Sequence, residues 1–164
     1  MKKFFAAALA MMMILSLAAC GGKKTEEPVQ APDLNAYVED FLVSLGEGNA
    51  PALMSISEDA DLVEGMFPGL GEIELNQTVL QLAAISAVGF EMDLVECAKA
   101  EDVETVKAIF QTRVDNQVAG GAFYPAVGEA WENASIIVNG NVVALIVAGE
   151  AQDAAVEAFN ALFN

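Results

Sequence analysis

The stretch SIIVNGNVVALIVAG, residues 135–149, gives the clearest indication of the fold. Two runs rich in β-branched and aliphatic residues flank the pair Asn139-Gly140. An Asn-Gly pair between two such runs is the strongest short-range signal for a β-hairpin, because both residue types tolerate the positive φ angles of a tight turn. We therefore predict two antiparallel strands joined at this pair.

A second pair of strands is predicted upstream of this hairpin. TVLQLAAISAV, residues 78–88, is apolar enough to be a central strand. FEMDLVEC, residues 90–97, alternates at first between apolar and acidic side chains. We expect its apolar positions to face the core and Glu91 and Asp93 to face solvent.

Four helices are predicted from apolar residues that recur every three or four positions. Asp33 is a suitable N-cap for the first helix, and Phe67-Pro68-Gly69 is expected to end the second. Residues 122–134 are predicted to form a loop or a short helical turn. The four predicted helices cover residues 34–45, 58–66, 101–118 and 153–163.

The resulting order, α-α-β-β-α-β-β-α, predicts an α+β domain. We expect a mostly antiparallel, four-stranded sheet with the helices packed on one face. The ββα unit occurs twice, and AED (100–102) and AQD (151–153) open its two helices. Duplication of one unit and chance similarity of two units both explain this pattern.

The N-terminal residues have the three parts of a secretory signal. Lys2 and Lys3 give it a positive start, residues 4–17 are apolar, and Ala18 and Ala19 close it. Residues 4–19 are shorter than the ~20 residues that a membrane-spanning helix needs. A removable signal peptide is therefore favoured over a permanent transmembrane helix.

Cys20 directly follows Leu17-Ala18-Ala19, and this stretch resembles the lipobox of bacterial lipoproteins. The resemblance implies cleavage between Ala19 and Cys20 and a covalent diacylglycerol on the Cys20 thiol, since two acyl chains give a stable membrane anchor. The alternative is an ordinary secretory signal with an incidental cysteine. We predict a signal peptide at 1–19, a lipidated cysteine and flexible linker at 20–32, and a single α+β domain at 33–164.

The composition excludes several classes of function. Removal of residues 1–19 leaves five basic residues against 24 acidic ones, a formal net charge of −19 that repels nucleic acid and anionic lipid headgroups. The chain has no histidine, which removes His-dependent nucleophilic catalysis and nearly all zinc sites. With Cys20 lipidated, Cys97 has no partner for an intramolecular disulfide. Cys97 lies on an apolar strand and is expected to be buried.

Four segments of the chain form a further pattern: MFPGL (66–70), AEDVETVKAIFQTRVDNQVAGGAFYP (100–125), NGNVVALIV (140–148) and VEAFNALF (156–163). Together with the lipobox, they resemble a family of small clostridial lipoproteins that carry a domain of unknown function. The sequence departs from the family pattern at Phe67, where tyrosine is expected, and at Phe123, where tryptophan is common. The resemblance implies a location and a size, and it brings no activity or catalytic residue with it.

Paired carboxylates are the first candidate functional groups. Such pairs could bind Ca²⁺ or hydrolyse glycosides, but the spacing is not that of an EF-hand loop, and pairs arise by chance in so acidic a chain. We assign no catalytic or metal-ligating residue, and we expect no cofactor beyond the diacylglycerol on Cys20. The pairs are Asp59/Asp61, Glu72/Glu74 and Glu91/Asp93.

An aromatic cluster, Phe123, Tyr124 and Trp131, lies between the third predicted helix and the hairpin. Loops on a rigid scaffold often carry binding residues, although these rings could instead cap the core.

We expect a lipid-anchored protein on the outer face of the cell membrane that binds an envelope protein or a small ligand, and does not bind nucleic acid. The alternative is a small carboxylate-dependent hydrolase that acts on cell-envelope or extracellular substrates.

Overall fold

The computed structural model describes residues 31–164. The predicted signal peptide, the cleavage site at Ala19 and Cys20, and most of the linker lie outside these residues. Short 3-10 helices precede β2, α4 and α6, and a single wide turn, η4 (Gln117–Gly121), follows α4. The elements are α2 (Leu34–Ser44), β1 (Leu53–Ser55), α3 (Ala60–Met66), β2 (Leu75–Ala83), β3 (Glu91–Cys97), α4 (Val103–Asn116), α5 (Pro125–Glu132), β4 (Ser135–Asn139), β5 (Val142–Val147) and α6 (Gln152–Ala161).

The strands form one antiparallel sheet in the order β1-β2-β3-β5-β4. The α+β class is confirmed, but the sheet has five strands where the sequence predicted four. The additional strand, β1, has three residues and pairs only with β2, from Leu53 opposite Ala83 to Ser55 opposite Gln81. A segment so short carries no alternation pattern, so its strand conformation depends on the partner.

The predicted hairpin is present as β4 and β5. The turn is one residue later than predicted, because Asn139 pairs with Val142 and the loop is Gly140-Asn141. Gly140 has φ 58° and no residue other than glycine has a positive φ among the described residues. Glycine at the first loop position is what a type II′ turn requires.

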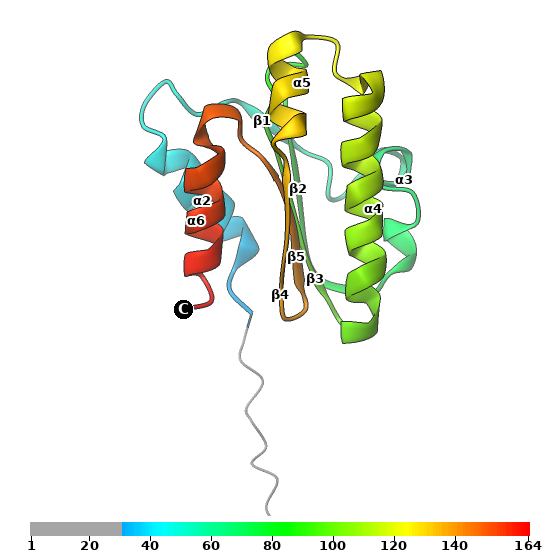
Figure 1. The fold of residues 1–164 in the computed structure, drawn as a ribbon. Coiled ribbons are helices and arrows are strands. Elements are labelled where there is room, and N and C mark those ends of the chain that lie inside the picture. The colour runs from blue at the N-terminus through cyan, green and yellow to red at the C-terminus, as the bar shows by residue number, and fades with distance from the viewer. Residues whose placement is uncertain (1–30) are drawn as a thin grey trace, which may run out of the picture. The chain divides into compact units, whose positions relative to one another are not determined.

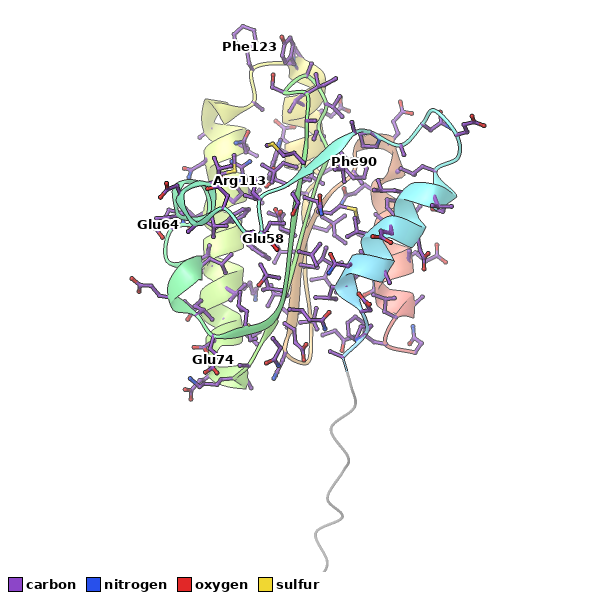
Figure 2. The ribbon with its side chains drawn as sticks, turned by 180° about the vertical axis from the view of Figure 1, so that it is seen from behind. Glu58, Glu64, Glu74, Phe90, Arg113 and Phe123 are labelled. Carbon is purple, nitrogen blue, oxygen red and sulfur yellow. The ribbon has the colours of Figure 1, made fainter. Side chains whose placement is uncertain are left out.

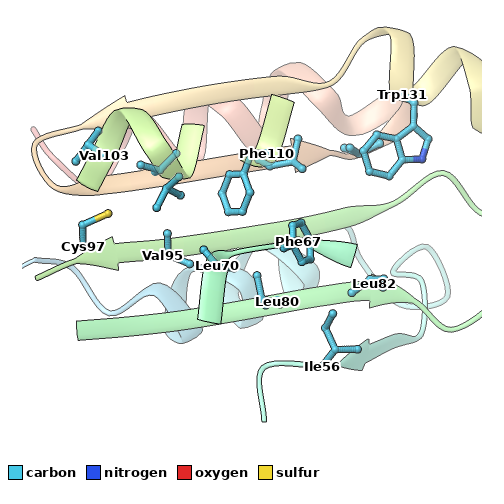
Figure 3. Close-up of a cluster of buried hydrophobic side chains, with 14 of the residues drawn as sticks. Ile56, Phe67, Leu70, Leu80, Leu82, Val95, Cys97, Val103, Phe110 and Trp131 are labelled. Carbon is cyan, nitrogen blue, oxygen red and sulfur yellow. The ribbon is translucent and has the colours of Figure 1, made fainter. Parts of the chain in front are cut away.

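Helices cover both faces of the sheet, which corrects the prediction of a single helical layer (Figure 1). α2 and α6 pack on one face, and α3, α4 and α5 pack on the other. The physical reason is that every residue of β5 is buried, so this strand has no face to give to solvent. Figure 3 shows part of the core on the α4 face, where Phe67 and Phe110 meet edge to face with ring centroids 5.6 Å apart.

The prediction that Glu91 and Asp93 face solvent is wrong. β3 is the middle strand, and Glu91 and Asp93 are only 4% and 0% exposed. Met92 and Leu94 face α2 and α6 as expected, but α4 covers the opposite face, where Val95 and Cys97 are also buried. Asp93 lies in the sheet between Leu80 of β2 and Leu145 of β5.

The first helix confirms its sequence signals. The Asp33 carboxylate accepts a hydrogen bond from the backbone N–H of Ala36 at 3.1 Å, as an N-cap should. The Tyr37 hydroxyl donates to the Ala155 carbonyl at 2.8 Å, which joins α2 to α6, and burial raises the pKa of that hydroxyl.

None of the helices in residues 31–164 is long and apolar enough to cross a membrane.

The residues that connect α4 to β4 are more helical than predicted. They contain α5, which begins at Pro125, a residue whose fixed φ suits the first turn of a helix. Gly120 (φ 131°) turns the chain at the end of α4, so that α5 folds back over the end of the sheet. The start of α2 and the C-terminus lie toward one end of the domain, and Phe123 lies at the other (Figures 1 and 2).

Candidate ligand-binding site

A cavity of about 360 Å³ lies at the end of the domain that carries Phe123. Its walls include residues of β1, the ends of β2 and β3, the C-terminal turn of α4, η4 and α5. Most of the lining side chains are apolar, and several are aromatic or thioether groups. The lining residues that matter for its chemistry are Met54, Glu91, Arg113, Phe123, Tyr124 and Trp131.

The charged part of the cavity is an ion pair between α4 and β3. Arg113 Nε donates to Glu91 Oε1 at 3.0 Å, and Nη2 donates to Oε2 at 2.8 Å. The two side chains are 12% and 5% exposed, so this is a buried, bidentate pair. Burial opposes the charge of Arg113, but the hydrogen bonds and charge of Glu91 outweigh it and raise the pKa of the guanidinium.

Two aromatic rings hold the guanidinium on its other sides. The Arg113 Cζ atom lies 5.1 Å from the centroid of the Trp131 ring and 5.9 Å from that of Phe67. A cation over an aromatic face is attracted by the ring quadrupole, more strongly where water is excluded. The ion pair and the rings together fix the orientation of Arg113 at the cavity wall.

Asp93 lies two residues along β3 from Glu91, on the same face of the sheet. It is completely buried, and neither carboxylate oxygen has a hydrogen-bond partner. Burial and then the negative charge of Glu91 raise the pKa of Asp93 well above its ordinary value, against a smaller lowering by Arg113. This favours the protonated, uncharged form of Asp93. Among the described residues, Glu91 is then the one carboxylate beside Arg113 that carries a charge.

The aromatic cluster predicted from the sequence is divided between core and surface. Trp131 is 4% exposed and packs in the core, so it caps the core and also lines the cavity. Phe123 is 87% exposed, Tyr124 is 44% exposed, and their rings meet edge to face with centroids 5.3 Å apart. Phe123 and Tyr124 thus form an exposed aromatic rim beside the cavity.

Two of the other candidate carboxylates, Asp59 and Glu74, have structural roles. Asp59 caps α3 by accepting a hydrogen bond from the Leu62 N–H at 3.0 Å, and Glu74 forms an exposed ion pair with Lys99 at 3.3 Å. Within residues 31–164, no three carboxylate or cysteine side chains converge as a metal site would require. A wider, open hollow beside Asp59 is lined by hydroxyls and carboxylates that include this cap.

Cys97 is completely buried in the core on the α4 face, as predicted. Burial, and then the charges of Asp102 and Glu96, raise the pKa of its thiol. A thiol that is buried and disfavoured as a thiolate is a poor nucleophile.

Sequence reasoning missed the Arg113–Glu91 pair. A signal for it was present, since Arg113 is the only arginine in the chain. It also follows Val106 and Phe110 at the spacing of the buried stripe of α4. A lone arginine on the buried face of a helix calls for a carboxylate partner, because an unpaired buried charge is costly.

No protein-family model, curated protein or solved structure matches the chain. The resemblance to small clostridial lipoproteins therefore stays a prediction from the sequence.

Proposed function

We propose that the domain is a binding module, not an enzyme, and that its cavity takes a small ligand. The observation that carries the proposal is the convergence of Trp131, Tyr124 and the buried Arg113–Glu91 pair on one cavity of about 360 Å³. Ligand sites in proteins are concave and mostly apolar, with a few placed polar groups that orient the ligand, and volumes of about 300–1,000 Å³.

A carboxylate-dependent hydrolase is the less favoured alternative. Glycoside hydrolysis needs two carboxyl groups on opposite sides of the scissile bond. Among the described residues, Glu91 is the only carboxylate that lines the cavity, and both of its oxygens already accept hydrogen bonds from Arg113. Asp93 is completely buried beneath the helix layer and does not line the cavity.

The proposal predicts that an indole placed in the cavity abolishes binding. Ala122 is half-buried and lines the cavity, so Ala122→Trp should fill part of it. We would screen the purified protein by thermal unfolding against amino acids, peptides, sugars and cell-wall fragments. A ligand at 100 times its dissociation constant adds about 2.7 kcal/mol of stability, which shifts the unfolding temperature by several degrees. The wild-type protein should show this shift, and Ala122→Trp should not. Equal shifts in both proteins would place the binding elsewhere.

We also propose that a diacylglycerol on Cys20 tethers the protein to the outer face of the membrane. The support is the order of signals in the sequence: basic residues, a short apolar stretch, a lipobox-like Leu17-Ala18-Ala19-Cys20 and a polar linker. Residues 21–32 would span about 20 Å as a flexible chain, which would keep the domain close to the membrane. Its partner there would be an envelope protein or a small ligand.

The tether predicts a clear effect of Cys20→Ser. Without the thiol no thioether can form, so incorporation of labelled fatty acid should be lost and the protein should move from the membrane fraction to the medium. Cells that express the wild-type chain provide the comparison. A Cys20→Ser protein that stays unprocessed in the membrane fraction would favour a plain apolar anchor instead.

A further inference from the structure

The guanidinium of Arg113 has a hydrogen-bond donor that the protein does not use. Nε and Nη2 donate to Glu91, whereas Nη1 donates to no described residue. Among the described residues, fully buried side-chain polar atoms without a partner occur only in Asp93, so Nη1 keeps contact with solvent. Arg113 lines the cavity and its guanidinium is flanked by Trp131 and Phe67, so the cavity is the side from which this donor can be reached.

The cavity offers this donor without a net positive charge. Glu91 neutralises Arg113 at hydrogen-bond distance, and Arg113 is the only basic residue in the described lining. The chain carries a net charge of −17. A ligand carboxylate would therefore meet a neutral pair inside an acidic protein, and the single Nη1 donor would not replace its lost hydration.

A cationic ligand is also poorly matched. It would find no unpaired carboxylate in the described lining, because Glu91, the only one there, already has both oxygens bonded to Arg113. It would also lie beside the guanidinium, which has a charge of the same sign. Most of the remaining lining is apolar and aromatic, with Trp131, Tyr124 and Met54 among its members, and Ser86 and Gln117 add two neutral polar side chains. The cavity therefore matches neutral apolar groups.

We infer that the cavity binds an uncharged apolar or aromatic molecule that bears a carbonyl-type oxygen, and that this oxygen accepts a hydrogen bond from Arg113 Nη1. The inference rests on the proposed binding function and adds the class of ligand. The apolar body lies against Trp131 and Tyr124, and the carbonyl sets its direction in the cavity.

Four probes with one aromatic body separate the alternatives by calorimetric titration of the intact protein. N-acetylphenylalaninamide is neutral and has carbonyls, N-acetylphenylalanine is an anion, phenethylamine is a cation, and ethylbenzene has no acceptor. We expect the amide to bind at least ten-fold more tightly than each of the others. Tightest binding of the anion or the cation, equal binding of the amide and ethylbenzene, or no binding of any probe would overturn the inference.

Two variants test the role of the guanidinium. In Glu91→Gln the positive charge of Arg113 is no longer neutralised, so the preference should change from the amide to the carboxylate probe. In Arg113→Lys the planar fork that holds Nη1 in place is lost and the ammonium is drawn to Glu91, so the amide should bind less tightly than it does to the wild-type protein. An unchanged probe order in Glu91→Gln, or undiminished amide binding in a folded Arg113→Lys protein, would contradict the inference.

The Ala122→Trp variant distinguishes failure of this inference from failure of the proposed function. If a probe of another class binds the wild-type protein and not Ala122→Trp, the cavity is a ligand site and only the class is wrong. If every probe that binds does so equally in both proteins, the cavity is not the site and both proposals fail.

Discussion

Replacing Arg113 by methionine should lower the free energy of unfolding by about 3–5 kcal/mol, the usual cost of removing one partner from a buried ion pair. The variant leaves the Glu91 carboxylate 5% exposed and without its two donors. Much of the packing of the arginine stem is kept by methionine, so the loss measures the unpaired charge. Urea unfolding of the wild-type and Arg113→Met proteins gives the difference directly.

Two matched variants show whether burial is the cause. In Arg113→Met/Glu91→Met both charges are gone, and most of the lost stability should return, since an apolar replacement of a buried pair is often neutral. Lys107→Met breaks an exposed pair with Glu104, in which nitrogen and oxygen are 3.5 Å apart, and should cost less than about 1 kcal/mol. An Arg113→Met loss as small as that of Lys107→Met would show that Glu91 finds other partners.

The second large effect is a dependence of stability on pH that arises from Asp93. Because burial raises the pKa of Asp93 in the folded protein, the folded state binds more protons than the unfolded state above the ordinary aspartate pKa of about 3.9. Its contribution is therefore most favourable below about pH 4 and is lost as the pH rises through the folded-state pKa. For one proton the slope reaches about 1.4 kcal/mol per pH unit.

The Asp93→Asn variant separates the pH dependence that Asp93 causes from the pH dependence that the acidic surface causes. Asparagine has almost the same shape and does not ionise, so the variant should be more stable than the wild-type protein near pH 8, and the gap should close toward pH 4. Unfolding at a series of pH values, repeated in 1 M salt to screen surface charges, measures the gap. A gap independent of pH would mean that Asp93 is equally protonated in both states.

The elements that the sequence predicted well are those with a complete local pattern. The hairpin was found because a turn pair separates two apolar runs, and α2 was found because a capping residue precedes an apolar stripe. The strand predicted at 78–88 lies at Leu75–Ala83 instead. Ile85 and Val88 extend the apolar run but lie in the exposed loop after β2, at 61% and 39% exposure. Composition alone does not distinguish apolar residues in an exposed loop from apolar residues in a buried strand.

The candidate site was predicted only in part, because it depends on contacts between distant segments. The aromatic loop was identified from its composition, and it does border the cavity. Glu91 and Asp93 were assigned to solvent because alternation along β3 shows that its two faces differ, not that α4 covers the acidic one. Pairing of Glu91 with Arg113, 22 residues away, follows from the packing of α4 on the sheet.

The arrangement of the chain ends has a practical consequence. The start of α2 and the C-terminus lie toward one end of the domain, and the aromatic rim beside the cavity lies at the other. A fusion partner, an affinity tag or a sensor surface joined directly before α2 or at the C-terminus would lie away from the aromatic rim. The loops at the far end could also change in length or composition without disturbing the attachment. The domain is thus suited to serve as a scaffold on which new recognition loops are selected.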